Sequence, residues 1–218
     1  MLFPIRKRFV YHIESLRAEL LRLWEEVEQM CSRALSSMHS GQTTPASWVV
    51  AQQPQVHRNR RYIEHEVLSL LATQQPIVAF DLRLVLAIPS IASDLETIAD
   101  DAVTLGRRTL ATAAPTLPDT ACELSMLLHT MLQTGREAFV QQDVELARTL
   151  GKLDRRAHTL LGQLRATPTE HYPTCSPELL IEASYGMAAI ASRSTRIAER
   201  VIYMLTCTSE ELNPPYIR

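Results

Sequence analysis

The sequence contains few of the residues that are typical of β-sheets or of small folds held together by metal ions. Its 218 residues include only six glycines, four phenylalanines and two tryptophans. Leu, Ala, Glu and Arg recur throughout, and this balance favours helix over sheet. The four cysteines lie far apart and form no CxxC pair, which argues against a zinc ribbon or a dense disulfide framework.

Long hydrophobic runs are also missing. A membrane-spanning helix needs ~20 apolar residues, and the best candidate, residues 82–92, contains Arg83 and Pro89. No apolar signal-peptide core follows Met1, so we expect a cytoplasmic protein. The formal net charge of −2 provides no overall field that would attract nucleic acid or an anionic membrane.

What the sequence does contain is strong helical periodicity. Apolar side chains in residues 13–34 recur at alternating steps of three and four, which places them on one stripe of a long helix. The same spacing predicts five further helices, at about residues 43–73, 78–105, 124–139, 143–164 and 177–204. Asp143 is expected to cap the fifth helix. Pro54 falls inside the second segment and predicts a kink or a late start of that helix, and Pro89 predicts a bend in the third helix.

A proline-containing stretch, residues 113–119, separates the first three predicted helices from the last three. Helices that are apolar along one stripe must bury that stripe against one another. The sequence therefore predicts an all-α fold of two tandem three-helix bundles, formed by residues 1–114 and residues 115–218.

Four short strings resemble the pattern of the PhoU family. The sequence reads QQPIVAFDLR at residues 74–83 and DLETIAD at residues 94–100. The second half contains DVELA at residues 143–147 and IAERVIY at residues 197–203. The resemblance covers the whole chain. It implies a cytoplasmic negative regulator of phosphate uptake that links the nucleotide-binding subunit of a phosphate ABC transporter to a sensor histidine kinase.

The resemblance also implies a place for a metal, because some members of the family bind metal clusters through acidic pairs four residues apart. Glu96 and Asp100 match such a pair, and the pair expected on the preceding helix falls on Gln53 and His57. Carboxylate oxygens and an imidazole nitrogen suit Fe, Zn, Mn or Mg. We therefore predict a metal site at His57, Glu96 and Asp100.

The second half retains less of this pattern. One of its pairs falls on Asp154 and His158, and the other falls on Ala188 and Ser192, which supply no carboxylate. A bound metal should therefore favour the first half, and a protein without any metal is the alternative. All of these polar residues also have a purely structural interpretation, as the solvated edges of bundle helices.

Little in the sequence suits an enzyme, because it contains no Gly-rich phosphate loop, GxSxG string or HExxH string. We therefore predict an adaptor without chemistry of its own. The alternatives are a diverged PhoU-like metal-binding protein that serves another transporter, and a metal-dependent enzyme. Long helices and a negative net charge argue against DNA binding. The resemblance further implies a homodimer. The local support for it is the long first helix, on which we expect Trp24 to be an exposed contact residue.

Overall fold

The computed structural model describes residues 3–73, 78–112, 117–168 and 177–214. These residues form six α-helices, and no strand occurs among them. The helices are α1 (Phe3–Ser40), α2 (Thr43–Thr73), α3 (Ala79–Ala111), α4 (Asp119–Gln141), α5 (Val144–Ala166) and α6 (Pro177–Thr206). The helical periodicity of the sequence thus predicted both the number and the order of the elements correctly.

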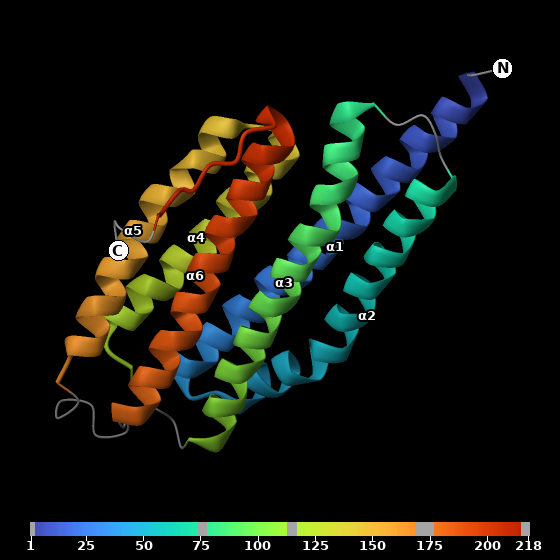
Figure 1. Ribbon diagram of the computed structural model, residues 1–218. Coiled ribbons are helices and arrows are strands. Elements are labelled where there is room, and N and C mark those ends of the chain that lie inside the picture. Colours follow the sequence, from blue (N-terminus) through green and yellow to red (C-terminus); the bar gives the residue numbers. More distant parts are fainter. Residues whose placement is uncertain (1–2, 74–77, 113–116, 169–176, 215–218) are drawn as a thin grey trace.

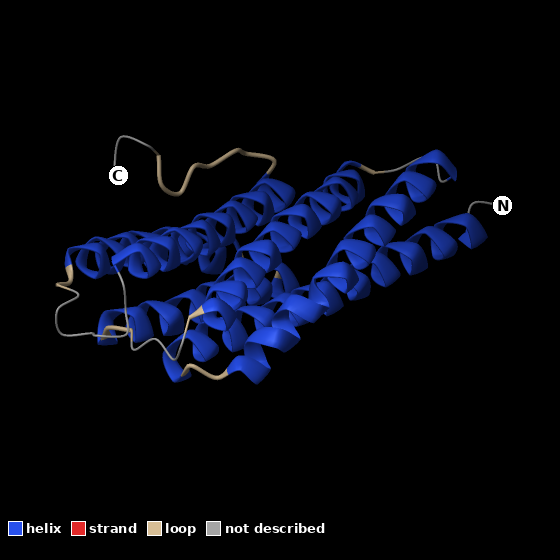
Figure 2. Ribbon diagram, turned by 90° about the horizontal axis from the view of Figure 1, so that it is seen from below, coloured by secondary structure: helices blue, strands red, loops and turns tan. Residues whose placement is uncertain are grey.

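The helices form two groups of three. Figure 1 shows α1, α2 and α3 on one side of the molecule and α4, α5 and α6 on the other, and Figure 2 shows both groups built from long helices. The groups meet where α3 packs on α6 and where α1 packs on α4. The predicted all-α fold of two three-helix bundles is confirmed.

The predicted boundary between the halves lies outside the described residues. On its two sides, α3 ends at Ala111 and α4 begins at Asp119. The division into residues 1–114 and 115–218 as separate units stays a prediction.

Trp24 is part of the core, so its predicted role as an exposed contact residue is wrong. Its side chain is 0% exposed, and its ring centroid lies 6.3 Å from that of Phe139 on α4. A Cβ added at Gly135 of α4 would lie 3.3 Å from Trp24 Cζ2, which shows how closely the two helices approach there. Because α1 packs against helices of both groups, the buried part of α1 is wider than a single apolar stripe.

The two internal prolines do not end their helices. Both α2 and α3 continue through Pro54 and Pro89. A proline inside a helix removes one backbone hydrogen bond and bends the axis, and Figure 1 shows α2 changing direction within its first half. The predicted late start of α2 does not occur, because the helix already begins at Thr43.

Two helix ends determine the course of the chain in the second half. Asp143 caps α5 as predicted, because its Oδ1 accepts a hydrogen bond from the backbone N–H of Leu146 at 3.0 Å. After α6, Cys207 adopts the left-handed conformation with a φ of 61°. The chain then turns back, and the C-terminal segment (residues 207–214) runs along α5 (Figure 1).

Candidate functional site

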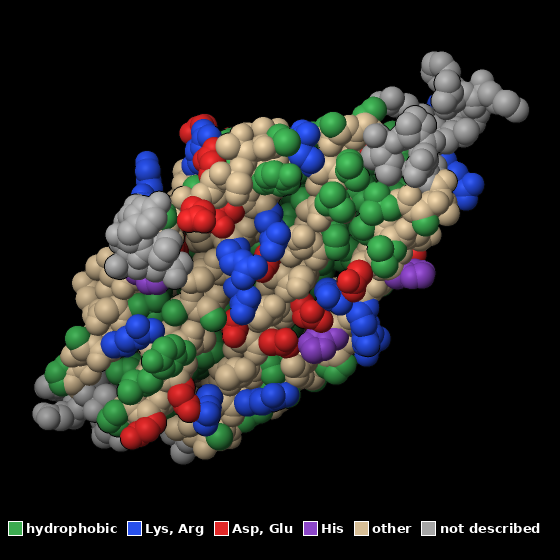
Figure 3. Space-filling view, viewed as in Figure 1, with side chains coloured by type: hydrophobic (Ala, Val, Ile, Leu, Met, Phe, Trp, Pro, Cys, Tyr) green, Lys and Arg blue, Asp and Glu red, His purple; other side chains and the backbone are tan. Residues whose placement is uncertain are grey.

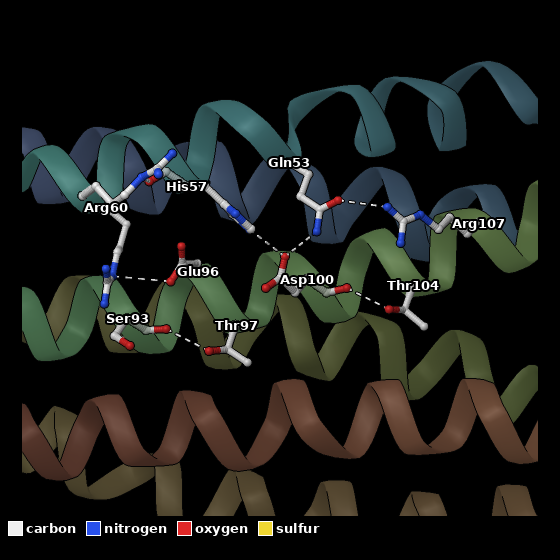
Figure 4. A network of polar contacts seen from close by, with 10 residues as sticks. Gln53, His57, Arg60, Ser93, Glu96, Thr97, Asp100, Thr104 and Arg107 are labelled. Atoms are coloured by element: carbon white, nitrogen blue, oxygen red, sulfur yellow. Dashed lines mark hydrogen bonds and ion pairs between the residues drawn. The ribbon is translucent and has the colours of Figure 1, made fainter.

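The first polar cluster lies between α2 and α3 (Figure 4). His57 Nε2 is 3.0 Å from Asp100 Oδ1, and Gln53 Nε2 donates to the same oxygen at 2.7 Å. Gln53 Oε1 accepts in turn from Arg107 Nη2 at 3.0 Å. Residues four apart on a helix lie one above the other, so Gln53 and His57 both reach one carboxylate on the neighbouring helix.

Glu96 lies one turn from Asp100 but has a different partner. Its carboxylate is 3.4 Å from Arg60 Nε, and Arg60 also contacts Glu64 at 2.7 Å. The structure therefore brings His57 and Asp100 together and leaves Glu96 paired with an arginine (Figure 4). Arg60 lies three residues after His57 and so lies near it on the helix surface, but no sequence pattern indicated that it would pair with Glu96.

These contacts bear on how well the first half fits a metal ion. In the described residues, no group of three or more His, Cys, Asp and Glu side chains lies close enough to hold one. His57 and Asp100 supply one nitrogen and one oxygen donor at a partly exposed edge. A third ligand would require Glu96 to part from Arg60, so the metal site stays a prediction.

The second polar cluster surrounds Asp154 on α5. The Asp154 side chain is fully buried, and His158 Nε2 lies 3.7 Å from its Oδ2. The side-chain amide of Asn213, in the C-terminal segment, donates to the same oxygen. Asp154 Oδ1 has no hydrogen-bond partner among the described residues. The protein therefore covers the carboxylate of this predicted ligand pair with its own chain.

Three further contacts hold the C-terminal segment in place. The backbone N–H of Leu212 donates to Glu199 Oε1 at 2.9 Å, and Arg148 binds both carboxylate oxygens of Glu210, at 3.0 and 2.6 Å. A Cβ added at Gly151 of α5 would lie 3.1 Å from the carbonyl oxygen of Leu212, so the glycine permits this close approach. Burial raises the pKa of Glu199. No sequence pattern predicted this segment.

A third cluster joins the two halves between α3 and α6. Arg200 Nε donates to Asp94 Oδ2 at 2.7 Å, and Arg196 Nη2 lies 3.5 Å from Asp94 Oδ1. Arg83 Nε donates to the carbonyl oxygen of Met204 at 3.0 Å. Arg83 and Asp94 belong to the strings at residues 74–83 and 94–100, so part of the family-like pattern lies at this junction.

The comparison with protein families gives a match in the first half. Residues 20–109 match the sequence model of the PhoU domain. Similar proteins include the phosphate-specific transport system accessory protein PhoU homolog of Pseudomonas aeruginosa, 28% identical, with 94% of this chain and 88% of the relative covered. The accessory protein PhoU of Escherichia coli is 27% identical, with 91% and 86% covered.

Solved structures agree with these matches. The crystal structure of PhoU from Pseudomonas aeruginosa is similar to this chain with a TM-score of 0.84 and 26% identity, covering 92% of this chain and all of that one. A regulatory protein PhoU from Streptococcus pneumoniae shares the fold with a TM-score of 0.84 at 20% identity, over 93% of this chain and 99% of that one. Together with the sequence matches, this confirms the resemblance to the PhoU family: residues 20–109 match its domain, and the whole chain is similar to PhoU proteins in sequence and fold.

Proposed function

We propose that this protein is an accessory and regulatory protein of a phosphate transport system. The supporting observation is its similarity to proteins of that name over more than nine tenths of its length. The relative in Clostridium acetobutylicum, a PhoU homolog of the same accessory function, is 25% identical, and the match covers 95% of this chain and 99% of the relative. The shared helical architecture extends the similarity to both halves.

The mode of action we propose is binding rather than catalysis. The described polar clusters are hydrogen bonds and ion pairs between neighbouring elements of the chain. Long packed helices offer broad and rigid faces to a partner. A partner that binds such a face in only one of its conformations has its equilibrium shifted toward that conformation.

The proposed partners are the nucleotide-binding subunit of a phosphate ABC transporter and a sensor histidine kinase. The protein would restrain uptake and phosphate-starvation signalling from the cytoplasm. None of the described helices has an apolar stretch that could cross a membrane. The proposal includes a homodimer, for which Trp24 offers no support because it is buried.

Deletion of the gene tests the proposal. In phosphate-rich medium, the deletion strain should express phosphate-starvation genes and take up phosphate without restraint, and a plasmid copy should reverse both effects. Normal phosphate-dependent expression and uptake in a strain without a second copy would refute the assignment. Sedimentation of the purified protein as a monomer would remove the homodimer from it.

One observation favours a second candidate function. The expected acidic pair of α6 is replaced by Ala188 and Ser192, so the second half lacks carboxylates that the family pattern supplies. A diverged member that serves another transporter could lose such residues. In that case, the deletion would change the uptake of another solute and leave phosphate uptake unaffected. Uptake measurements on the same deletion strain test this.

A further inference from the structure

A pocket of about 400 Å³ lies between α3, α6 and the C-terminal segment. Its volume is within the range of small-molecule sites. In Figure 3, Lys and Arg side chains gather in the middle of the visible face, over α6 and next to α3. The lining includes three arginines and three hydroxyl-bearing side chains: Arg83, Arg196, Arg200, Ser90, Tyr203 and Ser209.

Two of the arginines are fixed in a way that leaves most of their donors free. Arg83 is held through Nε by the carbonyl oxygen of Met204, and Arg200 is held through Nε by Asp94. A guanidinium carries five N–H donors. Neither side chain makes a further hydrogen bond to another residue of the described part of the chain. Both are therefore oriented by the protein, and no described residue accepts a hydrogen bond from their outer N–H groups.

The carboxylate behind these arginines does not balance them. Asp94 contacts both Arg196 and Arg200, and its single negative charge compensates one of the two. Arg83 forms no ion pair with any described residue, since its hydrogen bond goes to a neutral carbonyl. The side chain of Arg196 is 53% exposed, so its guanidinium can reach a ligand in the pocket.

Three glutamates also line the pocket and must be counted against the arginines. Glu210 is bound at both oxygens by Arg148, which lowers its pKa and compensates its charge. Glu199 accepts the backbone N–H of Leu212, and its charge also interacts with that of Arg196, which it compensates in part. Glu211 is exposed, so water and salt screen its charge. The pocket therefore has no large net charge. Its distinguishing feature is a set of guanidinium N–H groups that donate to no described residue.

We propose that this pocket binds a small oxyanion of the phosphate type. Several guanidinium groups together with hydroxyl donors suit a tetrahedral dianion, whose oxygens accept hydrogen bonds from several directions. The side chain of Leu86 and the aromatic ring of Tyr203 line the same pocket, and these residues are 51% and 47% exposed. They provide an apolar surface for the organic part of a phosphorylated molecule. The source of the group is either free phosphate or a phosphate monoester.

A purely structural role does not account for the whole arrangement. The Arg200–Asp94 pair is sufficient to connect α6 to α3. Arg196 adds a second cation to a carboxylate that is already paired, at the longer distance of 3.5 Å. An arginine that served only to connect the helices would gain little from this exposed position. A bound anion would give Arg196 and the outer donors of Arg83 partners.

The test is titration calorimetry of the full chain with inorganic phosphate in a phosphate-free buffer, with sodium chloride keeping the ionic strength constant. A parallel titration uses a phosphate monoester, and tighter binding of one ligand identifies the source. We expect saturable binding at one site per chain. Arg196→Gln should weaken it about tenfold or more, because one charge-assisted contact is lost, and Arg83→Gln should act in the same direction.

Arg108→Gln is the matched control, because Arg108 is an exposed arginine of α3 that pairs with Glu182 outside the pocket. It should leave the affinity unchanged. Binding that is absent, or equally strong in Arg196→Gln and wild type, overturns the proposal. Because Arg196 is exposed, its variant keeps the test valid if Arg83→Gln fails to fold. The measurement needs no partner protein, so its failure would leave the proposed regulatory function intact.

Discussion

The two halves of the molecule use their predicted histidine–carboxylate pairs in different ways. In the first half, His57 and Asp100 are each more than one third exposed, and they contact each other and neighbouring side chains of α2 and α3. In the second half, Asp154 is fully buried and the C-terminal segment covers it. The carboxylate that faces the histidine is therefore part of an accessible polar edge in the first half and an internal anchor in the second.

The difference shows which residues specify the fold and which are free to change. Both halves keep their apolar stripes, and these form one continuous core. Where the resemblance leads one to expect an acidic pair, the second half has Ala188 and Ser192, and α6 forms there all the same. A polar position on a bundle surface can thus change its role while the buried positions preserve the architecture.

The largest effect should come from the residue that connects the two halves. Trp24→Ala removes a fully buried indole from the contact between α1 and α4. We expect a loss of about 3–5 kcal/mol in the free energy of unfolding, because the substitution leaves a large cavity. Urea denaturation followed by circular dichroism measures this loss. It also shows whether the halves now unfold in two separate steps.

Trp48→Ala is the matched control. Trp48 is partly buried at the edge of the core, and the guanidinium of Arg33 lies 3.9 Å from its ring centroid. Its loss should cost about 1–2 kcal/mol, from lost apolar contact and a cation–π interaction. Equal costs for the two substitutions would contradict the role of Trp24 as the connection between the halves.

A smaller effect is expected at the covered site of the second half. Asn213→Ala removes the amide that donates to buried Asp154. A buried carboxylate that loses its donor costs about 1–3 kcal/mol. The free energy of unfolding should fall by that amount. Limited proteolysis should also cleave within residues 207–214 sooner than in the wild type.

Gln53→Ala makes the equivalent change in the first half. It removes an amide from Asp100, whose side chain is 39% exposed. Water can replace that hydrogen bond, so the cost should stay below about 1 kcal/mol. If Gln53→Ala were as costly as Asn213→Ala, the contrast between an accessible edge and a buried anchor would be wrong.

The sequence predicted the fold well because the fold depends on periodic apolar positions. The stripe in residues 13–34 and the cap at Asp143 are local features, and the structure confirms both. Trp24 was misjudged because helix periodicity alone does not reveal that α1 is buried on two sides.

The candidate sites were harder to predict because they depend on side chains that are distant in sequence. Nothing near Asp154 indicates that residue 213 reaches it across 59 positions. Likewise, the spacing of Glu96 and Asp100 placed both carboxylates on one face of α3, but not the arginine that pairs with one of them.

The smallest expected effect concerns metal binding. Here the comparison is between the abilities of the two halves to hold a metal ion. In the first half, an imidazole nitrogen and a carboxylate oxygen already lie 3.0 Å apart at an accessible edge. The pair predicted in the second half lies on α5 alone, 3.7 Å apart, and the C-terminal segment covers its carboxylate. Imidazole and carboxylate together suit Fe, Zn or Mn. Any bound metal should therefore favour the first half.

Elemental analysis of protein purified without a chelator tests whether bound metal favours the first half. The Glu96→Ala and Asp100→Ala double variant should lose the metal, whereas Asp154→Asn should retain it. Binding is expected to be weak, because Arg60 competes for Glu96 and two donors hold an ion less firmly than three. Circular dichroism must show that both variants are folded. A metal content that the double variant leaves unchanged would exclude the first-half site, and loss of the metal in Asp154→Asn alone would assign it to the second half.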